Sequence, residues 1–159
     1  MFRVGDKIVH PMHGAGIVDE IVERKVNGIV RDYYSLKLPS GDMLVMIPTD
    51  TCEAIGVRSI LTGAETEQVL GEISHLEVQM DTNWNHRYRD NMLRLKSGNL
   101  LEVAKVVKGL SGRDSRRGLS NGERKMLHTA KQILISGLVL AQSLPYKTVE
   151  DNIDTLLNH

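Results

Sequence analysis

The stretch from Trp84 to Arg89 holds the residue types best suited to contact a nucleic acid. Trp84 stands at the predicted start of a helix, and Arg87 and Arg89 follow within a turn and a half. The dipole and free N–H groups of a helix N-terminus favour a phosphate, and nearby arginines strengthen the attraction. An aromatic ring at such an edge can insert into a groove of the duplex. A lone tryptophan is more often part of the core, so both interpretations stay open here.

A second basic cluster covers residues 113–117, and Arg124 and Lys125 follow just beyond the next predicted helix cap. These cations would surround a junction between two helices, where they could contact phosphate groups. The alternative is a solvated loop in which ion pairs to Asp114 and Glu123 neutralise the charge. The sequence alone does not separate these two interpretations.

The charge of the chain is unevenly distributed, although the formal net charge is zero. Residues 63–83 hold 5 acidic residues and no Lys or Arg, whereas residues 84–131 hold 12 Lys and Arg against 4 Asp and Glu. A basic block of this kind is the electrostatic footprint of a phosphate-binding surface. On charge alone, a solvated helix face explains the block equally well.

Other combinations of reactive residues are scarce. His10 and His13 flank Pro11 in a predicted turn, which is not the helical arrangement of a zinc protease, so we expect no metal there. Cys52 is the only cysteine, which excludes an internal disulfide and a cysteine-based zinc site. The acidic residues are scattered and show no carboxylate pair. We therefore expect a protein that is not an enzyme and has no cofactor, no metal and no small-molecule substrate.

Nothing in the sequence predicts export or a membrane partner. No apolar run approaches the ~18 residues of a membrane span, and the segment Met1–Asp6 lacks the apolar region of a signal peptide. A single cysteine fits a reducing compartment. We therefore expect a cytoplasmic protein.

The chain up to about residue 58 has the pattern of short antiparallel strands. Asn27–Gly28 stands between two apolar runs, which predicts a tight hairpin. The predicted strands are rich in β-branched residues and are bounded by Gly and Pro. Residues 2–11 supply a first strand and a turn, and further strands lie at 17–23, 33–38 and 43–47, with a turn at 39–42. Strands this short in about 55 residues predict a small antiparallel barrel or a curled sheet of SH3-like size.

From Thr62 onward the apolar residues follow a helical period. Thr62 and Ser120 each open a predicted capping box, Asn99 is a further N-cap candidate, and Pro145 opens the last helix. In the first helix Val69, Ile73, Leu76 and Met80 are predicted to share one face. The sequence thus predicts an α+β protein with two domains: a β-barrel at 1–61 and a compact all-α bundle of about five helices at 62–159.

Four stretches together make the chain resemble the CarD/CdnL family of bacterial transcription regulators: Phe2–Asp6, Val9–Gly16, Thr82–Tyr88 and Arg113–Leu127. The resemblance implies that residues 1–61 are a Tudor-like RNA-polymerase-interaction domain, similar to that of transcription–repair coupling factor, which docks on the polymerase β subunit. It also implies that the helical domain contacts promoter DNA at the upstream edge of the transcription bubble. The protein would then be associated with the nucleoid through the polymerase.

The resemblance also implies roles for individual residues. Trp84 matches a tryptophan that inserts into the minor groove as a wedge and slows collapse of the bubble. The implied DNA-binding residues are Trp84, Arg87, Arg89, Arg117, Arg124 and Lys125. The implied polymerase-binding residues are Arg24, Met46, Ile47 and Pro48. Met46 departs from the pattern, because some relatives carry an arginine there that helps to bind β.

The sequence therefore leaves three functions open. The first is a polymerase-bound factor that stabilises the promoter open complex. The second is a polymerase adaptor in which Trp84 is buried and has no direct role on DNA. The third, which the sequence favours least, is a free-standing repressor that binds a specific operator without polymerase. The exposure of Trp84 distinguishes the first two.

Overall fold

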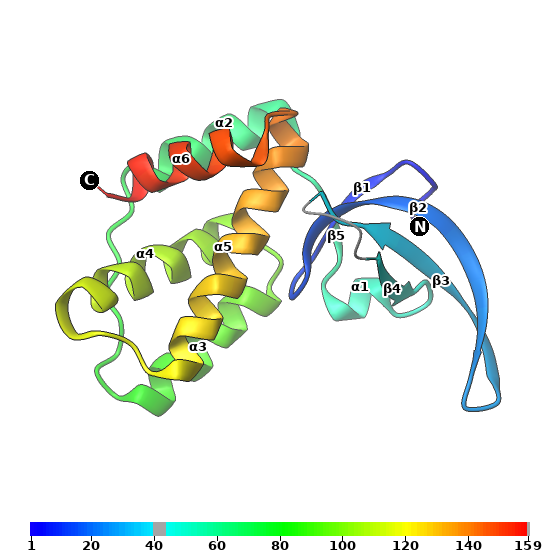
Figure 1. The fold of residues 1–159 in the computed structure, drawn as a ribbon, viewed down its shortest axis with the longest axis horizontal. Helices are drawn as coiled ribbons and strands as arrows, with labels where there is room; N and C mark the ends of the chain where they lie inside the picture. The colour runs from blue at the N-terminus through cyan, green and yellow to red at the C-terminus, as the bar shows by residue number, and fades with distance from the viewer. Residues whose placement is uncertain (40–43, 159) are drawn as a thin grey trace.

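The computed structural model describes residues 1–39 and 44–158. Part of the predicted turn at 39–42 and the first residue of the predicted strand at 43–47 lie outside these residues. The chain forms a twisted sheet beside a group of helices, as expected for an α+β protein (Figure 1). The strands are β1 (Lys7–His10), β2 (Gly14–Val26), β3 (Ile29–Lys37), β4 (Leu44–Pro48) and β5 (Arg58–Ser59), with the short helix α1 (Cys52–Ile55) between the last two.

The five strands form one antiparallel sheet in the order β4-β3-β2-β1-β5. A bulge between Val18 and Glu20 interrupts the register of β2 with β3, and bulges increase the local twist. The predicted Tudor-like barrel is not confirmed, because in the described part of the chain the sheet is open and has β4 and β5 as its two edges. The last strand, with only two residues, offers little backbone with which to close a barrel.

The predicted hairpin at Asn27–Gly28 is confirmed. Both residues have positive φ, 53° and 80°, as a two-residue type I′ turn requires. The strands that it joins are longer than the sequence pattern indicated, and the hairpin extends away from the rest of the molecule at the right of Figure 1. Several apolar side chains of this extension are exposed, among them Val26, Ile29 and Val30.

Five helices follow residue 62 in the described chain, as the sequence predicted. They are α2 (Gly63–Ile73), α3 (Trp84–Lys96), α4 (Leu100–Arg117), α5 (Asn121–Gln142) and α6 (Tyr146–Leu157). Thr62 forms the full capping box with Glu65, and Asn99 accepts hydrogen bonds from two N–H groups of the first turn of α4. No helix among the described residues is long and apolar enough to cross a bilayer.

Helix α2 is shorter than predicted. It ends at Ile73 with Ser74 as its C-cap residue. The Ser74 hydroxyl donates to the Gly71 carbonyl at 2.7 Å. Leu76 and Met80 therefore lie in a connecting segment, although both still pack against the helical core. Met80 lies directly over Gly109 of α4, where a Cβ atom would meet its Sδ and Cε atoms.

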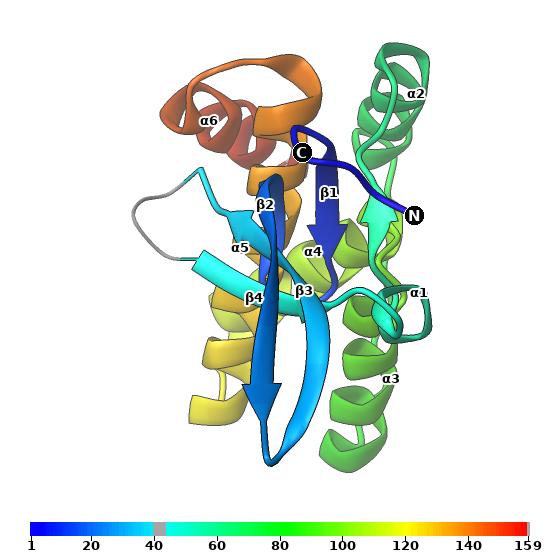
Figure 2. The same ribbon diagram turned by 90° about the vertical axis from the view of Figure 1, so that its right-hand side faces the viewer.

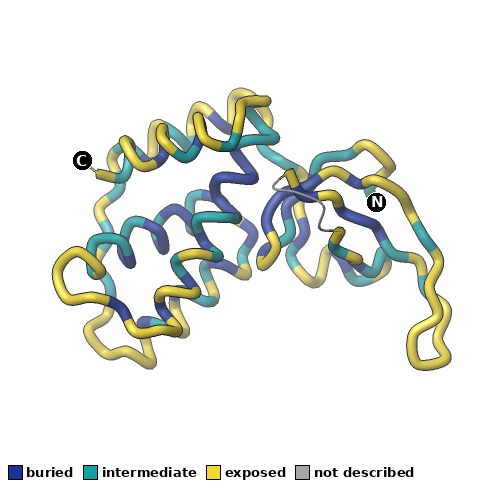
Figure 3. The backbone as a smooth tube through the Cα atoms, viewed as in Figure 1, coloured by how far each residue is buried: buried dark blue, intermediate teal, exposed yellow. Residues whose placement is uncertain are grey.

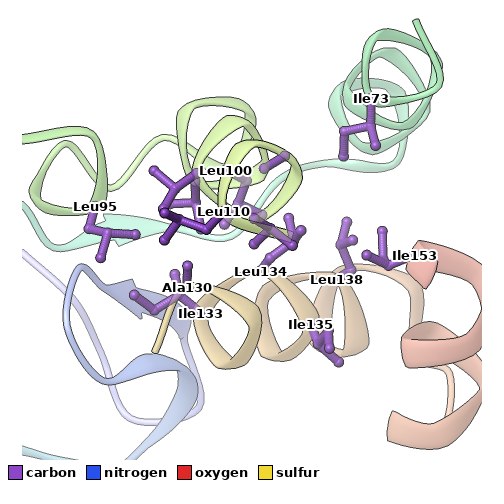
Figure 4. Packing of buried hydrophobic residues seen from close by; sticks show 14 of the residues in the cluster. Ile73, Leu95, Leu100, Leu110, Ala130, Ile133, Leu134, Ile135, Leu138 and Ile153 are labelled. Carbon is purple, nitrogen blue, oxygen red and sulfur yellow. The ribbon is translucent and has the colours of Figure 1, made fainter. Parts of the chain in front are cut away.

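Helix α5 is at the centre of the larger hydrophobic core. Of its buried residues, Leu134 lies below Leu110 of α4 and Leu138 lies beside Ile153 of α6 (Figure 4). The same helix lies behind the sheet in Figure 2 and packs against β1 and β2. One long apolar helix therefore contacts both parts of the molecule, and the tube coloured by burial shows it almost continuously buried in its middle (Figure 3).

Strand β1 contributes buried residues both to the core of the sheet and to the core of the helices. Ile8 belongs to the core of the sheet, and its neighbour Val9 belongs to the helical core, because successive residues of a strand point to opposite faces. Ala15 of β2 also packs in the helical core, and its N–H donates to the Oγ of Ser136 on α5 at 2.8 Å. The two predicted domains therefore pack together through a buried interface. The boundary between them at 61/62 remains a prediction.

Candidate nucleic-acid interface

Trp84 is the first residue of α3 and leaves 42% of its surface exposed. Its indole stacks on Tyr88 one turn later, with ring centroids 4.9 Å apart and planes inclined by 18°. The indole Nε1–H donates to the Oγ of Ser120 at 3.1 Å. A Cβ atom at Gly122 would lie 3.8 Å from the Trp84 ring. One face of the indole is therefore supported by protein, and a substantial part of the ring reaches solvent.

Two helix starts meet at this tryptophan. Asn83 caps α3 by accepting from the N–H of His86 at 3.1 Å, and Ser120 caps α5 by accepting from the N–H of Glu123 at 3.2 Å. The first turns of α3 and α5 lie next to each other at the lower end of the helices in Figure 1, joined by the hydrogen bond from Trp84 to Ser120. The N-terminal ends of two helix dipoles therefore face the same region of the surface.

Arg87 is not on this surface, and the expectation that it contacts DNA directly needs correction. Only 2% of its surface is exposed, as for its partner Glu123. Arg87 Nε donates to Glu123 Oε2 at 2.8 Å and Nη2 to Oε1 at 3.1 Å, while Nη1 donates to the carbonyls of Asp81 and Thr82. A guanidinium with these buried partners cannot also reach a phosphate outside the protein.

The predicted capping box at Ser120 is only half formed. Ser120 accepts from the Glu123 N–H, but the Glu123 carboxylate turns inward to Arg87 instead of returning to the N-cap backbone. The hydrogen bonds from Arg87 hold the pKa of Glu123 below its ordinary value, although burial opposes the shift. The same hydrogen bonds raise the pKa of Arg87. The pair is therefore doubly ionised at neutral pH.

The other four predicted DNA-binding cations do lie on the surface. All four are exposed and come from α3, the end of α4 and the start of α5: Arg89, Arg117, Arg124 and Lys125. Among the described residues, none of the four has an acidic partner within ion-pair distance. Glu123, which could have neutralised this region, is engaged by the buried Arg87. The positive charge of these side chains is thus available to a phosphate.

The predicted polymerase-binding residues divide between the two faces of the sheet. Met46 of β4 is opposite Ser35, which is opposite Glu20 of β2, so these side chains share one face. Strand alternation places Pro48 and Arg24 on that face as well. Met46 is 39% exposed and Arg24 is exposed.

Ile47 points to the other face, and the expectation that its side chain contacts a partner is wrong. It is 1% exposed and packs in the sheet core with Tyr34, its cross-strand neighbour. The reason is the alternation of the strand, because the neighbours of an outward-facing Met46 must face inward.

Two family models match the chain on either side of residue 61. Residues 2–61 match the CarD-like/TRCF RID domain, and residues 68–154 match the CarD C-terminal domain. The chain belongs to the CarD family. YdeB of Bacillus subtilis (strain 168), which its name describes as a candidate transcription factor, is 32% identical over 150 residues, covering 94% of this chain and 98% of YdeB.

Sequence reasoning missed the roles of three residues in the structure around Trp84. Tyr88 entered only as the end of the stretch Thr82–Tyr88, Ser120 only as a cap, and Glu123 only as a possible ion-pair partner of the nearby cations. Trp84 and Ser120 are 36 residues apart, as are Arg87 and Glu123. The equal spacing reflects the side-by-side start of α3 and α5, which no local pattern in one sequence reveals.

The remaining candidate residues of this CarD-family protein are His10, His13 and Cys52. The rings of His10 and His13 lie 4.6 Å apart, and His10 Nδ1 accepts from the N–H of Met12 and, at 3.3 Å, of His13. Burial, and then the nearby His13, lower the pKa of His10 to about 4. No group of three potential metal ligands occurs among the described residues. Cys52 is buried in the sheet core.

Proposed function

We propose that this CarD-family protein is a transcription factor that docks on the β subunit of RNA polymerase and stabilises the promoter open complex, with Trp84 as a wedge in the minor groove at the upstream edge of the bubble. The observation that carries the proposal is the exposure of Trp84 at the meeting point of two helix starts. Because the chain shares its family with YdeB, a role in transcription is also consistent with the name of that relative.

The exposure of Trp84 favours a wedge over a buried structural residue. An adaptor without a DNA role predicts a tryptophan in the core, whereas 42% of this residue is exposed. Stacking on Tyr88 supports one face of the ring and leaves it rigid enough to be pressed between bases. Partly exposed aromatic side chains that are held from one side are suited to such insertion.

The surrounding cations support contact with the DNA backbone without sequence readout. Arg89 of α3, Arg117 at the end of α4, and Arg124 and Lys125 near the start of α5 are exposed, and exposed cations of this kind bind phosphate in a salt-dependent way. We propose that the shape and deformability of the DNA at the bubble edge matter more than the base sequence. A repressor that recognises an operator by itself would need more groups that read base edges.

Docking through the sheet would compensate for weak DNA affinity. The outer face of the sheet carries Arg24, Met46 and Pro48, and the last two belong to β4. In the described residues β4 pairs only with β3, so it is an edge strand. An edge strand can add a strand of a partner to its sheet through main-chain hydrogen bonds. Tethering to the polymerase would keep Trp84 at a high effective concentration near the bubble.

The proposal is tested by the lifetime of the promoter open complex with Trp84→Ala. A contact worth about 1–3 kcal/mol, the scale of base–aromatic stacking, changes the rate of bubble collapse about ten- to a hundredfold if it forms only in the open state. We therefore expect a lifetime shortened by about this factor. Binding to the isolated β subunit should stay unchanged, because the substituted residue is on a different part of the molecule.

Leu93→Ala is a matched control for this experiment. Leu93 is on the same helix, is apolar and is more exposed than Trp84. We expect a wild-type lifetime, because Leu93 lies more than two turns along α3 from the helix start that carries Trp84. If Trp84→Ala has the lifetime of the wild-type protein while it still binds β, the wedge is wrong and the adaptor is favoured.

A further inference from the structure

We propose that Arg87, Glu123 and Ser120 are positioning residues that hold the Trp84 indole in one orientation before DNA is met. The orientation of the indole in the free protein does not depend on the proposed function. Its effect on the open complex does rest on that function, because it requires Trp84 to insert into DNA. This inference assigns Arg87 a role different from the phosphate contact expected from the sequence. It also assigns a role to an acidic residue inside a basic block.

The Arg87 guanidinium joins three segments of the chain. It bonds both carboxylate oxygens of Glu123 on α5, at 2.8 and 3.1 Å, and the carbonyls of Asp81 and Thr82, at 3.0 and 3.2 Å. The residue itself belongs to the first turn of α3, which Trp84 opens. A planar, bidentate pair of this kind restricts both distance and angle. It therefore fixes the start of α3 against the start of α5.

Ser120 extends this restraint to the indole itself. Its Oγ accepts both the Glu123 N–H and the Trp84 Nε1–H, at 3.2 and 3.1 Å. The oxygen that caps α5 is thus also the acceptor that sets the rotation of the indole. Gly122 lies beside both stacked rings, because a Cβ atom there would lie 3.8 Å from Trp84 Cζ2 and 3.7 Å from Tyr88 Cε2. The ring pair consequently rests on the first turn of α5.

A buried ion pair is an expensive way to join two helices. Well-packed apolar residues of similar volume are often equally stable or more stable, so stability alone does not explain Arg87 and Glu123 in this position. What an apolar pair lacks is directional geometry. An indole that is already oriented loses less conformational freedom when it inserts into DNA, and this saving increases the strength of the contact.

The first experiment compares Ser120→Ala with Ser120→Thr. Trp84 is the only tryptophan, so its fluorescence reports the site directly. Removing the acceptor should shift the indole emission, lower its anisotropy and increase its quenching by acrylamide. The variant loses the acceptor of the α5 cap as well as that of the indole, and loss of the hydrogen bond to the indole should shorten the open-complex lifetime about two- to tenfold. Thr keeps the hydroxyl, so Ser120→Thr should restore the emission, the anisotropy and the lifetime.

The second experiment replaces the ion pair by apolar residues, Arg87→Met together with Glu123→Leu. We expect a folded protein with a thermal transition close to that of the wild type, but a mobile, more readily quenched Trp84 and a shorter open-complex lifetime. Should the double variant and Ser120→Ala both keep the anisotropy and quenching of the wild-type indole, the positioning role is overturned.

The two proposals can fail separately in these measurements. If Trp84→Ala leaves the open-complex lifetime unchanged, the wedge is wrong, and the fluorescence of the free protein still decides whether the three residues orient the indole. If the indole is mobile in the variants and the lifetime is nevertheless unchanged, orientation of the ring before binding has no effect on the complex, and the functional part of this inference is overturned.

Discussion

At the scale of single residues, the ionisation of Glu123 links the site to pH. Its carboxylate is buried and accepts two hydrogen bonds from Arg87, which lowers its pKa. In an unfolded chain the same carboxyl would titrate at its ordinary pKa of 4.5. A carboxyl with a lower pKa in the folded state stabilises the fold above the unfolded pKa, and this contribution is lost as the pH falls through the folded value.

This linkage predicts the pH dependence of Glu123→Gln. The variant should be less stable than the wild type at pH 7, because a buried guanidinium loses its counter-charge. The difference should be constant down to about pH 5 and should shrink as the pH falls below the ordinary carboxyl pKa. Urea unfolding of both proteins across this range measures it. A difference that is the same at neutral and at strongly acidic pH would contradict the assignment.

At the scale of elements, two adjacent residues of β4 are expected to have different roles: Ile47 stabilises the fold, and Met46 contacts the polymerase. Ile47 is in the sheet core and Met46 is on the outer face. In the part of the chain that the structure describes, β4 is an edge strand, so one side of its backbone can pair with a partner. One strand can therefore contribute to folding through one residue and to binding through the next.

Substitution of these two residues should show the division. Ile47→Ala should destabilise the fold by about 2–5 kcal/mol, the range for truncation of a large buried side chain. Met46→Ala should change stability by less than about 0.5 kcal/mol, as at most surface positions, and should weaken binding to the β subunit. Urea unfolding and a titration with isolated β would measure the two effects. Equal loss of stability in both variants would refute the assigned orientation of β4.

At the scale of the whole molecule, the sheet and the helices are joined by buried contacts. Val9 and Ala15 of the sheet belong to the helical core, and Ser136 accepts the Ala15 N–H. Gly14 allows this approach, because a Cβ atom there would lie 2.5 Å from the Ser136 Oγ. We expect this interface to hold the proposed docking face and Trp84 at a fixed separation, which a factor spanning polymerase and DNA requires.

Ser136→Ala tests the interface. It leaves the buried Ala15 N–H without its acceptor, which costs about 1–3 kcal/mol. Ser115→Ala is the control, because that serine is exposed and bonds only to the Ser111 carbonyl of its own helix. Urea unfolding should show a clear loss of stability for the first variant and almost none for the second. Equal stability of the two variants would mean that the Ala15–Ser136 bond does not contribute.

Local patterns were enough to predict much of this molecule. The hairpin turn at Asn27–Gly28, the capped helix starts at Thr62 and Asn99, and the basic block around α3 to α5 all depend on neighbouring residues. Backbone conformation at a turn and capping of a helix involve atoms only a few positions apart. Charge is likewise a property of residue type. Such features can be read from the sequence because they do not depend on how the elements pack.

Tertiary structure decided which of the candidate side chains reach solvent. Arg87 looked like a phosphate ligand in sequence, but Glu123, 36 positions away, draws it into the interior. Ser120 turned out to hold the indole of Trp84, and Ser136 bonds Ala15 across 121 positions. The open edges of the sheet were also decided at this level. Each outcome depends on the relative placement of two distant elements, and burial there changes the energy of a charge or a polar group far more than its sequence neighbours do.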